Sequence, residues 1–203
     1  MGFILLDVPF VSQNNIGSRS NMPRDAWRSE QNGCWYASAC MVGYFWEDGP
    51  RQGVPAQYAE NPLDPKGMGS RYDELKRNED FKGVPLPASQ KWTAEKLYNV
   101  LEYYGPCYVR RGFRNPVTGK LEHGHAIVLI GADVMGDRVM CLDPWQTENQ
   151  PGKGRQTYKI AEFNDFFKWD EYWAPGISLM YKKRKDPIAA AKYIASRKLT
   201  WWR

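Results

Sequence analysis

The residue best placed to do chemistry is Cys34, which follows the polar segment Gln31-Asn32-Gly33. Apolar residues recur after it at helical intervals, so Cys34 is expected at the first residue of a helix. Unbonded N–H groups and the positive end of the helix dipole favour a thiolate there, and they lower the pKa of a thiol. A cysteine of the apolar core would have apolar neighbours on both sides. The polar approach therefore predicts that Cys34 is a nucleophile.

A thiol nucleophile needs a base, and the sequence has only two histidines. His125 stands directly before the apolar run Ala126–Ile130, at a loop–strand junction, and His123 lies two residues upstream. Asp143 ends the strand expected to pair with that run through a turn at Gly136-Asp137. The two strand ends then place a carboxylate beside an imidazole. We therefore predict His125 as the base and Asp143 as the group that orients it.

The negatively charged oxygen formed in such chemistry needs donors, which are expected to be the Cys34 backbone N–H and a side-chain amide. Gln13 and Gln31 are the two candidates for the amide. The spacing of the residues alone does not choose between them.

The helices and strands that must position these residues are expected to form a single domain over residues 1–203. Helices come first and strands follow, which predicts an α+β fold with the cysteine helix packed on an antiparallel sheet. The helical part is expected over about 14–105, the sheet part over about 106–183 and a C-terminal helix over about 187–197. Helices are expected at 34–46, 70–80, 94–104 and 161–169, and strands at 107–113, 126–130, 138–142, 156–160 and 176–182, after an extended segment at 3–12.

Composition limits the binding partners. The four cysteines show no Cys-x-x-Cys spacing, so neither a metal nor another cofactor is expected. The net charge is +5, and the basic run 182–185 is interpreted as a solvated tail, so no nucleic-acid partner is predicted. No apolar run reaches the roughly 20 residues of a membrane span, so no membrane insertion is expected.

The N-terminal residues lack the charged region and apolar stretch of a secretory signal, because Asp7 and Pro9 interrupt the apolar run. The expected location is the cytoplasm in which the protein is made. Export, if it occurs, is expected through a specialised system.

Several motifs together resemble the papain-like cysteine peptidases, in particular the compact bacterial branch that includes bacteriocin-leader peptidases and papain-like effector proteases. They occur in the family's order and span most of the chain. The motifs are Leu6-Asp7-Val8-Pro9-Phe10-Val11-Ser12-Gln13, Gly33-Cys34-Trp35-Tyr36-Ala37-Ser38-Ala39-Cys40-Met41-Val42, Tyr104-Gly105-Pro106-Cys107-Tyr108-Val109, Gly124-His125-Ala126-Ile127-Val128-Leu129-Ile130-Gly131-Ala132 and Leu142-Asp143-Pro144-Trp145.

The resemblance implies a papain-like fold with Cys34 as nucleophile, His125 as base and Asp143 as orienting group. It also implies that Gln13, in the Val-Pro-x-x-x-Gln context, is the oxyanion glutamine. The family's glutamine usually lies nearer the cysteine, where this chain has Arg28. Gln13 therefore fits if residues 14–30 are an insertion, and Gln31 remains the alternative.

The predicted function is a cysteine protease that cleaves peptide bonds through a thioester. The same residues would also serve a thiol amidase, a deamidase or an acyltransferase on peptidoglycan or protein side chains. A non-catalytic peptide-binding module is a third class. The expected partners are a protein or peptide substrate and an inhibitor or immunity protein, as for a bacterial secreted effector or toxin.

Overall fold

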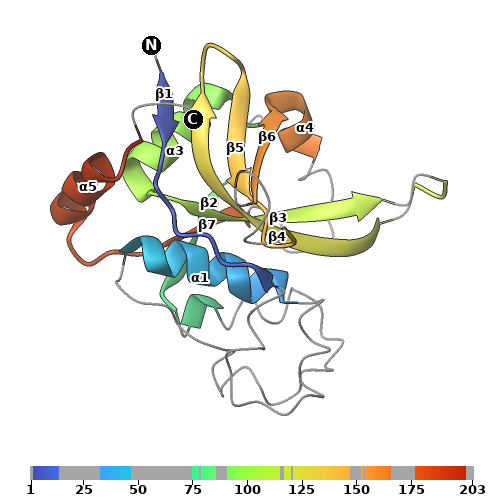
Figure 1. The fold of residues 1–203 in the computed structure, drawn as a ribbon, viewed down its shortest axis with the longest axis horizontal. Coiled ribbons are helices and arrows are strands. Elements are labelled where there is room, and N and C mark those ends of the chain that lie inside the picture. The colour runs from blue at the N-terminus through green and yellow to red at the C-terminus, as the bar shows by residue number, and fades with distance from the viewer. Residues whose placement is uncertain are drawn as a thin grey trace.

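A computed structural model describes residues 2–13, 33–46, 75–77, 79–85, 91–114, 117–119, 121–146, 152, 154–165 and 177–199. A curved antiparallel sheet carries helices on both faces (Figure 1). The elements are β1 (Phe3–Leu5), α1 (Cys34–Trp46), β2 (Phe81–Pro85), α3 (Ala94–Tyr104), β3 (Cys107–Arg114), β4 (Leu121–Asp133), β5 (Arg138–Leu142), β6 (Arg155–Lys159), α4 (Ile160–Asp165), β7 (Ile177–Lys182) and α5 (Pro187–Ser196).

The strands are arranged in the order β2-β7-β3-β4-β5-β6, and β1 pairs separately with β4. All the pairs are antiparallel. The predicted α+β class, with the cysteine helix packed on an antiparallel sheet, is confirmed. β4 is the centre of the sheet, because it pairs with β3, β5 and β1.

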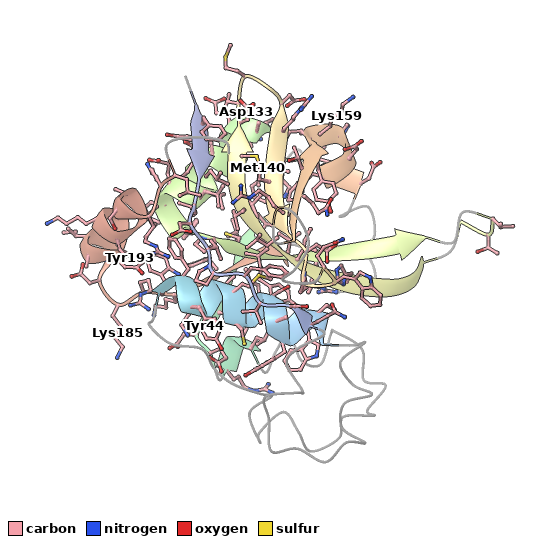
Figure 2. The ribbon with its side chains drawn as sticks, in the orientation of Figure 1. Tyr44, Asp133, Met140, Lys159, Lys185 and Tyr193 are labelled. Atoms are coloured by element: carbon pink, nitrogen blue, oxygen red, sulfur yellow. The ribbon has the colours of Figure 1, made fainter. Side chains whose placement is uncertain are left out.

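Alternate residues of the central strands enter two different apolar layers. Ala126, Val128 and Ile130 of β4 pack with α1, whereas Ile127 and Leu129 pack with α3, α4 and α5. Both faces of the strand are therefore buried, which explains its continuous apolar sequence. Figure 2 shows Met140 of β5 inside the molecule, while Lys159 and Lys185 lie at its periphery.

Local sequence signals explain where the outer helices begin and end. The Thr93 side chain accepts a hydrogen bond from the Lys96 N–H and caps α3, which ends at Gly105. Asp186 caps α5 in the same way, and Pro187 occupies the first turn. The apolar stripe of α3 faces the sheet through Leu97, Val100 and Leu101. These helices form the layer on the face opposite α1.

The predicted elements differ from the structure in two places: β2 is not predicted by the sequence, and β4 runs from Leu121 to Asp133 and is longer than the predicted 126–130. Of the helix expected at 161–169, residues 161–165 belong to α4, and 166–169 lie outside the described residues. Of the helix expected at 70–80, residues 75–77 are helical, residues 79 and 80 are not, and 70–74 and 78 lie outside the described residues. The unexpected strand β2 follows directly at 81–85. Residues 14–30, the insertion expected if Gln13 is the oxyanion glutamine, lie outside the described residues.

The two ends of the described chain meet beside β1. Leu6 forms a bridge with Lys198, and the Leu199 N–H donates to the Leu5 carbonyl at 2.7 Å. The Arg197 guanidinium lies 3.3 Å from the Asp7 carboxylate, and Lys198 pairs with Glu102 of α3. The C-terminal residues therefore fix the start of the segment that leads to Gln13.

Candidate active site

Cys34 is the first residue of α1, as predicted. The Gly33 carbonyl accepts from the Tyr36 and Ala37 N–H groups at 3.1 and 3.0 Å, so the Cys34 N–H precedes the first intrahelical bonds. All residues of α1 except Tyr44 are buried, and Cys34 itself is 6% exposed. The helix therefore crosses the core and presents the thiol at its positive end.

His125 and Asp143 contact each other directly, with Nε2 of the imidazole 2.7 Å from Oδ1 of the carboxylate. The register of the β4–β5 pair, in which Val128 lies opposite Leu142, brings both residues to the same end of the hairpin. The Trp145 N–H donates to the same Oδ1 at 2.9 Å. This second hydrogen bond fixes the Asp143 side chain to its own turn, in the orientation that contacts His125.

The His125 side chain also forms a hydrogen bond with the Cys34 side chain. Burial is the largest influence on this imidazole and lowers its pKa, because burial disfavours the charged form. The hydrogen bonds to Asp143 and Cys34, with the charges of both partners, outweigh burial and raise the pKa of His125 to about 9. The structure thus brings together three of the predicted residues in an arrangement that favours an imidazolium.

Gln13 lies beside the turn that carries Asp143. Its backbone N–H donates to the Pro144 carbonyl at 2.9 Å, and the residue is fully buried. Gln31, the alternative amide, lies outside the described residues. His123 is part of β4, but the structure does not describe its side chain.

Gly154 is a residue of this region that the sequence analysis missed. The Asp143 N–H donates to its carbonyl at 2.8 Å, which continues the β5–β6 ladder one step beyond the pair Leu142–Arg155. The backbone of Gly154 has a φ of +75°, which favours glycine. A signal was present, since two glycines, Gly152 and Gly154, stand directly before a strand.

The remaining cysteines are buried within the apolar layers and form no disulfide: Cys40, Cys107 and Cys141. Burial raises the pKa of Cys107 far above its ordinary value, which makes this thiol unreactive. Among the described residues, no group of three His, Cys, Asp or Glu side chains is arranged to hold a metal ion. Within the same residues, none of the helices has the length and apolar character needed to span a membrane.

This fold and site define the class of a papain-like cysteine peptidase, and the comparison with protein families agrees. The family described as papain-like cysteine protease AvrRpt2 (Peptidase_C70) matches residues 18–165, which is most of the chain. The protein belongs to this family and is a cysteine peptidase. The matched range contains Cys34, His125 and Asp143, whereas Gln13 precedes it.

A solved structure from Bacillus anthracis, described as a C39-like peptidase, is similar to this chain. The two sequences are 16% identical, and the match covers 90% of this chain and 99% of the other, with a TM-score of 0.46.

Proposed function

We propose that the protein cleaves peptide bonds with Cys34 as nucleophile, His125 as base, Asp143 as orienting group and Gln13 as oxyanion donor. The observation that carries the proposal is the continuous contact from the Cys34 thiol through the His125 ring to the Asp143 carboxylate. Asp143 engages Nε2, which leaves Nδ1 to exchange a proton with the sulfur.

In the proposed reaction the thiol proton passes to His125, and the thiolate attacks the carbonyl carbon of the scissile peptide bond. The Cys34 N–H and the Gln13 side-chain amide stabilise the resulting oxyanion. Collapse of this intermediate forms a thioester, and His125 returns the proton to the departing amine. Water then attacks the thioester with His125 as base, which releases the acid and restores the thiol. Asp143 stabilises the imidazolium throughout.

The substrate class is proposed to be a protein or peptide, because the family is one of proteases. The direct test is to incubate the purified protein with denatured proteins and to measure their hydrolysis, which the proposal expects to occur. Hydrolysis of peptidoglycan fragments or glutamine side chains, with no cleavage of any protein, would instead favour an amidase or deamidase with the same residues.

The decisive experiment compares Cys34→Ala with Cys40→Ala, because the two thiols lie on the same helix and are both buried. Cys34→Ala is expected to abolish peptide hydrolysis, while Cys40→Ala retains it. Iodoacetamide at neutral pH is expected to label Cys34 in preference to the other three thiols, as detected by mass spectrometry, because the proposed base His125 contacts Cys34 and can accept its proton. Activity that survives Cys34→Ala would contradict the proposal.

We further propose that the protein acts as a secreted effector or toxin, delivered by a specialised system from the cytoplasm in which it is made. The family match to the protease AvrRpt2 and the net charge of +5 support this proposal. A translocation reporter fused to the C-terminus is expected to leave the producing cells only when the secretion system is intact. Such a toxin would require an inhibitor or immunity protein, detectable as a stoichiometric complex that suppresses hydrolysis.

A further inference from the structure

The backbone around Asp143 is held from two sides by segments that are distant in sequence. On one side the Asp143 N–H donates to the Gly154 carbonyl at 2.8 Å. On the other side the Gln13 N–H donates to the Pro144 carbonyl at 2.9 Å. The turn that aims the Asp143 carboxylate is therefore enclosed between the start of β6 and the N-terminal segment.

At Gly154 the start of β6 lies against Phe10 of the N-terminal segment. It is buried, and a Cβ atom on it would lie 2.2 Å from Cε2 of Phe10 and 2.9 Å from the Asp143 carbonyl oxygen. Both separations are shorter than van der Waals contact, and the second involves backbone that cannot move alone. Any side chain at this position would therefore displace Phe10, Asp143 or both.

We propose that Gly154 is a positioning residue for the peptidase reaction: with Phe10, it fixes the Asp143 backbone so that Oδ1 points at His125. The inference rests on the proposed function of the Cys34–His125–Asp143 contact. Gly154 touches no reacting atom and acts only through Asp143.

A displaced Asp143 would weaken the 2.7 Å contact with Nε2. The titratable groups that act on the imidazole are the Asp143 carboxylate, beyond β5, and the Cys34 thiol, on α1. A loss of the Asp143 hydrogen bond therefore lowers the pKa of His125 from about 9, while the contribution of Cys34 remains.

The test compares Gly154→Ala with Gly152→Ala. Gly152 has a similar φ of +82°, but it is exposed, and the one described atom that a Cβ on it would meet within 4 Å is the Arg155 Cβ at 3.9 Å. Both variants carry the backbone strain of a positive φ, and only Gly154→Ala presses on Asp143. We expect Gly154→Ala to lower kcat/KM on the order of a hundredfold, as for a small misplacement of a reacting group, and Gly152→Ala to match the parent.

The second readout is the His125 pKa itself, measured by NMR titration of the imidazole resonances. The chain has two histidines, so His123→Gln assigns the His125 signal. In Gly154→Ala the His125 pKa and the alkaline limb of kcat/KM are expected to shift together to lower pH. If Gly154→Ala titrates and hydrolyses like Gly152→Ala, the inference is wrong.

A double-mutant cycle separates positioning from a general loss of stability. If Gly154 acts through Asp143, Gly154→Ala has little further effect on kcat/KM in an Asp143→Asn background. Additive losses would contradict the inference. Gly154→Ala combined with Phe10→Ala removes the 2.2 Å conflict with the Phe10 ring and keeps the 2.9 Å conflict with the Asp143 carbonyl, so the double variant should still show the lowered His125 pKa.

The same experiments distinguish this inference from the proposed function. Activity that survives Cys34→Ala overturns the function, whatever Gly154→Ala does. A normal His125 titration in Gly154→Ala overturns only the positioning role.

Discussion

Asp143 Oδ1 accepts from His125 Nε2 at 2.7 Å, although the two residues are 18 positions apart and lie on either side of a hairpin. The same oxygen accepts the Trp145 N–H at 2.9 Å. One carboxylate oxygen is thus shared by the imidazole and a backbone donor of its own turn. This sharing fixes the direction of the carboxylate as well as its distance from the ring.

Asp143→Asn is expected to lower kcat/KM on the order of 10²–10⁴-fold, because an amide does not stabilise the imidazolium as a carboxylate does. The alkaline limb of the pH profile should also move to lower pH. Asp137→Asn is the matched control, since Asp137 is exposed at the opposite end of the β4–β5 hairpin. The backbone φ at this position is +49°, which asparagine adopts as readily as aspartate does. Equal activity of the two variants would contradict the role of Asp143.

The stability of the protein is expected to depend on the protonation of His125. Its pKa is raised in the folded state from the ordinary value of 6.5 to about 9. The folded state therefore binds the proton more tightly than the unfolded chain, and this contribution is fully present below pH 6.5 and is lost as pH rises through 9.

Urea unfolding of the parent and of His125→Gln, at several pH values, measures this contribution. The difference in the free energy of unfolding should shrink from pH 6.5 to above pH 9. A difference that grows with pH over this range would show that the folded state binds the proton more weakly than the unfolded chain.

Gln13→Ala is expected to lower kcat on the order of 10²–10³-fold with a smaller change in KM, as for the loss of one oxyanion donor. Gln31→Ala tests the alternative donor under the same conditions. Gln13 is fully buried, so thermal unfolding must accompany the kinetics to exclude a folding defect. A kcat loss in Gln31→Ala alone would assign the role to Gln31.

Gly105→Ala is expected to destabilise the fold by about 1–3 kcal/mol. Gly105 ends α3 with a φ of +75°, and a Cβ on it would lie 2.6 Å from Cζ2 of Trp46. Gly43→Ala is the contrasting variant, because a Cβ at this position in α1 meets no described atom within 4 Å. It should stabilise the protein by about 0.5–1 kcal/mol, and chemical denaturation of both variants checks the difference in sign.

The sequence predicted the parts of the fold whose signals are local. The helix from Cys34, the helix at 94–104 and the hairpin turn at Gly136-Asp137 each depend on a few neighbouring residues, and each occurs in the structure. The hairpin register then brings His125 and Asp143 to the same end of the sheet, which is why their proximity could be predicted.

Other features depend on pairing between distant segments. β2 is short, contains Gly83 and Pro85, and is a strand because it pairs with β7. The outer residues of β4 have no alternating pattern of their own and extend the strand because β3 and β1 pair with them. The role of Gly154 depends on the approach of Phe10, about which the local sequence carries no information.

The pairing of Leu6 with Lys198 has a consequence for the order of events during protein synthesis. The segment that carries Gln13 is made before its anchoring partners, Arg197, Lys198 and Leu199, which follow Asp143 in the sequence. A nascent chain can therefore contain Cys34, His125 and Asp143 before the N-terminal segment is anchored. The order of translation would thus delay the anchoring of the Gln13 segment beside the candidate site until residues 197–199 have been made.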